Sequence, residues 1–219
     1  MKPSKKYFRI DYAKIILKMG LVMLWLQIAI MVMAYSQSIL ITQLISPEAV
    51  SEYVIYNKLF AGITSVILLF LVPIWSMVTK AQTEKNIQWI YSILKKLNLL
   101  TLGTVIVCIL LVVFLQPIFN IWLGDESINV NYYKACVIAV YSIIFVWHNV
   151  NTSVSNGLSY FKVQNICMLV AVIFLFPLAK MISLFIHDWT SVVLSSSICL
   201  LPYEILQPIF TKRFLCIHK

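Results

Sequence analysis

Residues 51–75 of the chain read SEYVIYNKLFAGITSVILLFLVPIW, and this stretch decides the class of fold. It is long, apolar and almost uncharged, as a membrane-crossing helix must be, because spanning the hydrocarbon of a bilayer takes about 20 apolar residues. One residue departs from the pattern: Lys58 lies about two turns into this helix. A charged side chain inside the membrane costs roughly 2.5–3.5 kcal/mol on insertion scales unless water, a headgroup or a partner compensates it.

The composition of the whole chain agrees with a membrane protein. Of its 219 residues, 61% are hydrophobic and only 11% are charged, whereas soluble domains carry about 25% charged residues. The polar stretches between the apolar runs are too short to form a soluble domain. Five cysteines stand singly, without a CxxC pair or the spacing of metal ligands. Neither a disulfide framework nor a metal site is therefore predicted.

Outward from residues 51–75, the hydropathy pattern predicts an all-α, polytopic membrane protein with a bundle of six transmembrane helices. The predicted spans cover residues 19–45, 52–79, 98–122, 132–157, 163–185 and 189–211, which together form a membrane domain over 19–211. A basic segment, residues 1–18, precedes this domain, and a tail, residues 212–219, follows it. Residues 83–97 place apolar side chains at helical spacing with charges at the ends, which predicts an amphipathic helix on the membrane surface.

The distribution of Lys and Arg predicts the orientation of these spans. Residues 1–18, 80–97, 156–165 and 211–219 carry six, four, one and three of them, fourteen of the seventeen in the chain. The opposite loops are acidic. Because basic loops stay in the cytoplasm, both termini are expected there. The net charge of +9 is then a topology signal, and nucleic acid is not an expected partner.

Polar residues within the second span share one face. Gly62 and Ser65 fall beneath Lys58 on a helical wheel, and Asn57 is adjacent. Small residues beneath a lysine favour a helix-packed or cavity-lining face over a lipid-facing one. The alternative is that Lys58 snorkels to the outer surface, about 10 Å away.

The fourth and sixth spans carry further polar residues. One face of the fourth span holds Lys134, Tyr141, His148, Asn151, Thr152 and Ser155, which indicates a wet lumen or a helix interface. The sixth span carries Glu204, an intramembrane carboxylate that is by default a functional candidate. Glu204 and His148 are the candidates for ion coupling. The alternatives are a hydrated structural carboxylate and a hydrogen-bonded interior histidine.

Motifs of catalysis are missing from the sequence. It contains no HExxH, P-loop, GxGxxG or hydrolase signature. We therefore expect neither an enzyme nor a cofactor, and any transport would be driven by an ion gradient or by the substrate gradient.

Several segments together resemble one protein family. Gly20-Leu21 and Gln27-Ile28-Ala29, followed by Tyr53, Ile55 and Lys58-Leu59-Phe60, are similar to a helix–loop–helix segment of bacterial polysaccharide flippases, which include the O-antigen translocases. VPIWSMVTKAQ (72–82), IWLGDE (121–126) and NTSVSNGLSYFKVQ (151–164) resemble further segments of the same family in the same order. These flippases belong to the multidrug/oligosaccharidyl-lipid/polysaccharide exporter superfamily.

The resemblance implies a function and a location. It implies a part of a flippase that moves undecaprenyl-pyrophosphate-linked O-antigen or polysaccharide repeat units across the bacterial inner membrane. The lipid-linked oligosaccharide and membrane lipids are the implied partners. Lys58, Asn57, Ser65, Tyr141, His148, Asn151, Thr152 and Ser155 are the residues expected to line the cavity.

The chain departs from the family in size. Such flippases have about twelve spans in two halves, and the six spans here resemble the C-terminal half only. A truncated reading frame, a split gene with a separate N-terminal half, and a half that pairs with a second copy are the competing explanations. The first two are favoured, because residues 1–18 resemble a linker between halves. The alternative functions are a non-transporting remnant or partner subunit, and half of a multidrug exporter.

Overall fold

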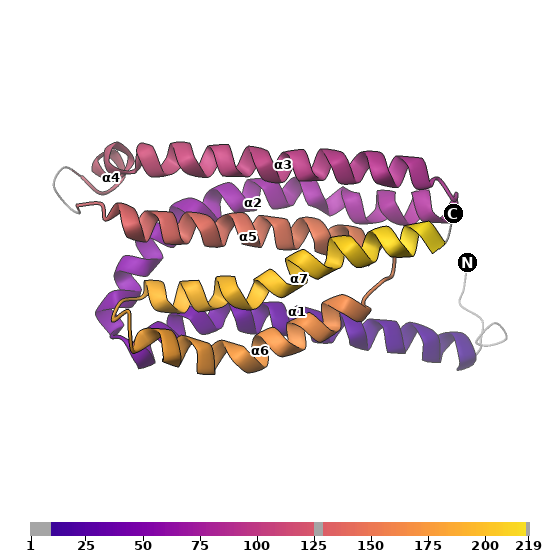
Figure 1. The fold of residues 1–219 in the computed structure, drawn as a ribbon, viewed down its shortest axis with the longest axis horizontal. Coiled ribbons are helices and arrows are strands. Elements are labelled where there is room, and N and C mark those ends of the chain that lie inside the picture. Colours follow the sequence, from indigo (N-terminus) through magenta and orange to yellow (C-terminus); the bar gives the residue numbers. More distant parts are fainter. Residues whose placement is uncertain (1–9, 125–128, 218–219) are drawn as a thin grey trace, which may run out of the picture.

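The chain forms seven α-helices over the part that its computed structural model describes, residues 10–124 and 129–217 (Figure 1). They are α1 (Ile10–Leu44), α2 (Pro47–Thr83), α3 (Ile87–Val113), α4 (Leu115–Leu123), α5 (Tyr132–Gly157), α6 (Lys162–Ser183) and α7 (Thr190–Ile217). All but α4 are long and apolar enough to cross a membrane. The chain is thus a multi-pass helical membrane protein with a six-span bundle, as the sequence predicts. Half of the predicted basic segment (residues 1–9), Asp125 and Glu126 of the predicted IWLGDE turn, and the last two residues of the tail lie outside the described residues.

Local capping residues set the helix boundaries. The Ser46 hydroxyl accepts a hydrogen bond from the backbone N–H of Ala49 at 3.3 Å, and Pro47 occupies the first helical position of α2. Both features favour a helix start. Asn131 caps α5 in the same way, since its side chain accepts from the backbone of Tyr133 and Lys134.

Two predicted boundaries around the third span are wrong. The surface helix predicted over 83–97 is not a separate element, because residues 87–97 are the first turns of α3 and no proline interrupts the ladder that continues to Val113. The third span was predicted to reach residue 122, but it ends at Val113. A new helix, α4, begins after Phe114. Pro117 explains this break, because its ring excludes the hydrogen bond to the carbonyl of Val113.

The helices run back and forth between two ends of the bundle. Figure 1 shows that α1 begins and α7 finishes at one end, which we call the terminal end; the α2–α3 and α5–α6 connections also lie there. The other end holds α4 and is called the α4 end. Figure 1 also shows that α7 changes direction near its middle. Pro202 and Pro208 lie inside this helix, and prolines are the usual cause of such bends.

Helices α5 and α7 occupy the centre of the bundle. In their most apolar 18-residue windows, 61% and 56% of the residues are buried, against 17% in both α1 and α3. Helix α5 packs against α2, α3 and α7, while α7 packs against α5, α6 and α1. Polar side chains on α5 and α7 are therefore enclosed by protein, whereas much of α1 and α3 is exposed.

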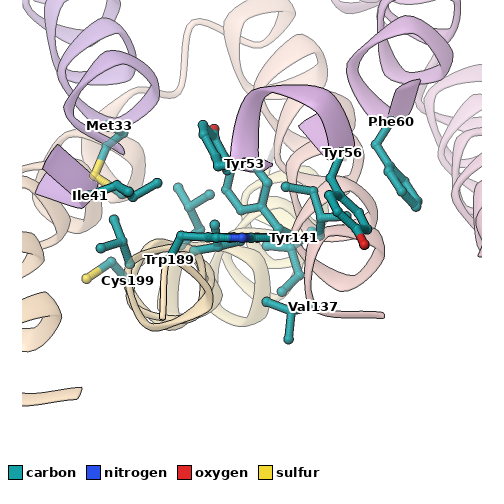
Figure 2. Packing of buried hydrophobic residues seen from close by; sticks show 14 of the residues in the cluster. Met33, Ile41, Tyr53, Tyr56, Phe60, Val137, Tyr141, Trp189 and Cys199 are labelled. Carbon is teal, nitrogen blue, oxygen red and sulfur yellow. The ribbon is translucent and has the colours of Figure 1, made fainter. Parts of the chain in front are cut away.

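The largest hydrophobic core extends from the middle of the bundle to the α4 end, where it includes Trp189, which is fully buried (Figure 2). The rings of Tyr53 and Tyr56 each lie 5.7 Å from that of Trp189, and Phe119 of α4 lies 5.3 Å from Tyr56. These contacts join α2, α4 and the residue just before α7 through geometries that aromatic pairs favour.

A close helix approach at the terminal end depends on Gly157. A Cβ atom at this position would lie 2.6 Å from the Cβ of Val78 and 2.9 Å from the carbonyl oxygen of Trp75. The Thr79 hydroxyl also donates to the Gly157 carbonyl at 3.0 Å. The absence of a side chain at Gly157 thus lets α5 meet α2 directly.

Candidate functional site

A buried pair of ionisable residues joins the two central helices. His148 Nδ1 of α5 lies 2.9 Å from Glu204 Oε1 of α7, and the side chains are 1% and 0% exposed. Asn151, one turn further along α5, donates from Nδ2 to Glu204 Oε2 at 2.6 Å. Both carboxylate oxygens therefore have a partner. His148 is about 14 Å from the terminal end of α5, at 1.5 Å per residue.

Hydroxyl and amide groups surround this pair. Thr152 Oγ1 lies 3.4 Å from His148 Nε2 and 3.4 Å from the hydroxyl of Tyr203. From α6, Gln164 Nε2 donates to the same Thr152 oxygen at 3.4 Å. The Tyr203 ring also packs against the imidazole with centroids 4.9 Å apart. Three helices, α5, α6 and α7, thus contribute to one polar cluster.

The cluster continues toward the terminal end. Gln207 Nε2 of α7 donates to Ser155 Oγ at 2.5 Å and to Thr211 Oγ1 at 3.2 Å. The amide oxygens of Gln207 and Gln164 are buried and find no donor among the described residues. We call the residues joined in this way the α5–α7 network: His148, Asn151, Thr152, Ser155, Gln164, Tyr203, Glu204, Gln207 and Thr211.

A second polar region is a pocket between α1, α2 and α5, with a volume of about 190 Å³. It is lined by Ala34, Gln37, Tyr53, Asn57, Ala61, Thr64, Tyr141, Ser142 and Phe145. The Tyr53 hydroxyl donates to Gln37 Oε1 at 2.6 Å. The Asn57 amide makes no hydrogen bond with the described residues. This pocket, hereafter the α1–α2–α5 pocket, contains amides and hydroxyls but no charged side chain.

Lys58 and Ser65 lie outside this pocket. Lys58 directly follows Asn57, but its side chain points to the exposed surface of α2 and makes no ion pair or hydrogen bond with residues 10–124 or 129–217. Gly62 and Ser65 are exposed on the same helix, and the Ser65 hydroxyl donates to the carbonyl of Ala61 within its own helix at 2.7 Å. This surface of α2 is not covered by another helix of the described chain.

Charged residues at the α4 end form a third group. Lys134 Nζ of α5 lies 2.5 Å from Glu52 Oε2 of α2 and 3.1 Å from Asp188 Oδ2, just before α7. Trp189 Nε1 donates to the same Glu52 oxygen at 2.9 Å. These contacts hold α2, α5 and the start of α7 together. Lys134, which was predicted on the polar face of the fourth span, is thus neutralised by two carboxylates.

The structure divides the residues expected to line one cavity. Asn57 and Tyr141 meet in the α1–α2–α5 pocket, whereas His148, Asn151, Thr152 and Ser155 belong to the α5–α7 network with Glu204. Lys58 and Ser65 join neither group. Gln37, Gln164 and Tyr203 were not predicted, and only their position as polar residues inside apolar runs could have indicated them.

No metal centre is apparent among the described residues. Over residues 10–124 and 129–217, no three His, Cys, Asp or Glu side chains are grouped so that they could hold a metal ion. The carboxylates that do meet another ionisable group are held by Lys134, by His148 or by Lys80.

Comparison with known proteins adds no relative. No family model, no curated protein and no solved structure matches the chain. The fold and the two polar regions define a class, a multi-pass helical membrane protein with polar regions inside its helix bundle.

Proposed function

We propose that the chain is one half of a transporter that moves undecaprenyl-pyrophosphate-linked O-antigen or polysaccharide repeat units across the bacterial inner membrane. The observation that carries this proposal is the α1–α2–α5 pocket, an uncharged polar pocket inside a bundle of apolar spans. Asn57 lies about 15 Å from the start of α2, which is well inside a membrane-crossing helix. A hydrogen-bonding group without a partner at such a depth is costly, so a polar ligand or water is expected beside it.

The position of Lys58 supports a ligand that carries an anionic headgroup. It is adjacent to Asn57 and has no counter-charge among the described residues. The neighbouring Gly62 has open space where a side chain would be. Where water is excluded, an ammonium attracts a pyrophosphate more strongly than it does in water. The saccharide would then occupy the polar pocket while the pyrophosphate binds near Lys58.

The orientation follows from the basic residues at the terminal end. Lys80 and Lys85 lie at the α2–α3 connection and Lys162 begins α6, all at the terminal end. Short loops rich in Lys and Arg remain in the cytoplasm. We therefore place both termini in the cytoplasm and the α4 end in the periplasm.

A multidrug exporter of the same superfamily is the second candidate, and one observation favours it. The α1–α2–α5 pocket contains the rings of Tyr53, Tyr141 and Phe145 and no charged group, which suits an aromatic organic cation. In this case Lys58 would be dispensable, because a cationic drug gains nothing from a lysine. Drug resistance conferred by the chain, unchanged by Lys58→Ala, would favour this candidate.

Complementation of a flippase-null strain tests the proposal. We expect surface polysaccharide when the chain is expressed with a flippase N-terminal half. Polysaccharide from this chain without a supplied half would favour pairing with a second copy. No polysaccharide in either case, with the protein present in the membrane, would contradict the proposal and favour a non-transporting remnant or partner subunit.

Lys58→Ala tests the role of the exposed lysine in the same strain. We expect loss of surface polysaccharide at unchanged protein level. Lys180→Ala is the matched control, since Lys180 is also exposed within a predicted span, near the α4 end of α6. If both variants display polysaccharide equally, Lys58 does not bind the pyrophosphate.

A further inference from the structure

The His148–Glu204 pair is buried where charge is expensive. Neither side chain reaches the surface. Among the described residues, each is the only charged or ionisable partner of the other within ion-pair distance. A carboxylate in such surroundings needs a proton or a positive partner, because desolvation of an uncompensated charge costs several kcal/mol. A neutral imidazole beside an ionised Glu204 leaves one negative charge, and one added proton removes it.

Among the described residues, no other charged side chain forms an ion pair with His148 or Glu204. The titratable side chains that face Glu204 are Cys167 of α6 and Tyr203 of α7, both of which interact electrostatically with it. Helices α1, α2 and α3 also pack against the three helices of the network. Over residues 10–124 and 129–217 they place no Lys, Arg, Asp or Glu within ion-pair distance of the pair. The charge of the site therefore depends on the protons of His148 and Glu204.

Polar groups continue directly from the pair toward the terminal end, whereas toward the α4 end an apolar turn separates the pair from the next buried polar side chains, Ser142 and Ser197. Toward the terminal end lie Ser155, Gln207 and Thr211, together with the buried amide oxygens that lack donors. Toward the α4 end, the residues one turn away on the same helix faces are Ile144 and Leu200, both buried in the hydrophobic core. Water or a proton thus meets hydrogen-bonding groups from the terminal end and an apolar layer from the α4 end.

We propose that His148 and Glu204 together bind one exchangeable proton, which reaches them from the terminal end of the bundle. On binding, the proton converts a neutral imidazole beside a carboxylate into an imidazolium–carboxylate pair, with no other bond changed. Imidazolium Nε2–H then donates to Thr152 Oγ1, and the Thr152 hydroxyl donates to the hydroxyl of Tyr203. The use of this proton as a coupling ion rests on the proposed function; its binding does not.

Proton binding is measured on the purified full chain in lipid nanodiscs, without substrate. A pH jump within about pH 5 to 8, where histidines exchange protons, is followed with a soluble indicator. We expect the wild-type chain to bind one proton more than Glu204→Gln, which keeps the shape of the side chain. Equal proton counts would overturn the proposal.

A second measurement keeps the test valid if Glu204→Gln fails to fold. The chain has three histidines, and His187→Gln with His218→Gln leaves His148 as the single ¹⁵N-histidine signal. We expect this signal to change between the two ends of the same pH range. An imidazole signal that stays constant would mean that the pair holds its proton permanently and serves only as a structural link.

The direction of access is tested by the rate of exchange. Gln207→Leu with Thr211→Val removes polar groups toward the terminal end at nearly constant volume, and we expect proton exchange in a stopped-flow pH jump to slow by about tenfold or more. Thr190→Val is the matched control, a buried hydroxyl at the α4 end of the same helix. Equal rates in both variants would overturn access from the terminal end. Proton binding without complementation of the flippase-null strain would support this inference and contradict the proposed function. Complementation without proton binding would support the proposed function and contradict this inference.

Discussion

The two polar regions of the bundle differ in which of their groups are paired. In the α5–α7 network, both oxygens of Glu204 have partners at 2.6 and 2.9 Å, and three helices supply the bonds. In the α1–α2–α5 pocket, Tyr53 and Gln37 pair, but the Asn57 amide has no partner among the described residues. The paired Glu204 carboxylate stabilises the fold, whereas the unpaired Asn57 amide in the pocket stabilises only a complex with a ligand. Substitutions in the network should therefore change mainly the free energy of unfolding, and substitutions at unpaired groups of the pocket should change mainly transport.

The largest expected effect is that of Glu204→Leu on stability. This change leaves His148 and Asn151 without their buried acceptor, and removal of one partner of a buried pair lowers the free energy of unfolding by about 3–5 kcal/mol. Denaturation in mixed micelles, followed by helix content, gives the value. A loss below about 1 kcal/mol would show that the network does not hold α5 and α7 together.

Gly157→Ala should have the next largest effect, because it separates the helices that carry the two regions. The new methyl group would lie within 3 Å of Val78 and of the Trp75 backbone. We expect the free energy of unfolding to fall by about 1–3 kcal/mol, as for other overpacked positions.

Gly62→Ala provides the control for this substitution. Gly62 also lies inside a helix, but nothing lies within 4 Å of an added Cβ. This variant should be neutral or slightly stabilising, since alanine favours helix. If both alanine variants unfold at the same denaturant concentration, α5 does not depend on its close contact with α2.

A smaller loss is expected from Tyr53→Phe within the pocket. The variant removes the hydrogen bond from the Tyr53 hydroxyl to Gln37 while keeping the ring that packs on Trp189. Hydrogen bonds between membrane helices average about 0.6 kcal/mol, so the free energy of unfolding should fall by about this amount. A loss as large as that of Glu204→Leu would place the pocket in the same structural class as the network.

The sequence predicts the number of spans well, because each apolar run is long enough to be read without knowledge of its neighbours. It does not predict where α3 begins and ends. The charges of Lys95 and Lys96 indicate a surface helix, yet helical hydrogen bonds continue through them. Pro117 ends α3 at Val113, before the predicted end of the span at residue 122. Hydropathy indicates whether a residue lies in water or in an apolar environment, whereas the break between α3 and α4 depends on backbone geometry.

The candidate site is less accessible to sequence reasoning. The polar face of the fourth span is evident from the seven-residue spacing of Tyr141 and His148. The partner of that face is not, since Glu204 lies 56 residues from His148 in the chain. Lys58 was expected to line a cavity because of the small residues beneath it. Its exposure on α2 depends on which side of that helix the other spans cover, a tertiary property that no helical wheel contains.

The smallest effect on stability, and the sharpest separation of the two regions, is expected from Asn57→Leu. Because the Asn57 amide has no partner among the described residues, its loss removes no hydrogen bond, and the free energy of unfolding should change by less than about 0.5 kcal/mol. In the complementation strain the same variant should abolish surface polysaccharide, since an apolar side chain would replace the group that faces the ligand. Glu204→Leu would lower both stability and protein level, so the ratio of polysaccharide to membrane-inserted protein distinguishes the two variants. If Asn57→Leu unfolds as readily as Glu204→Leu, or if it displays normal polysaccharide, the pocket has the structural role of the network and not the binding role proposed for it.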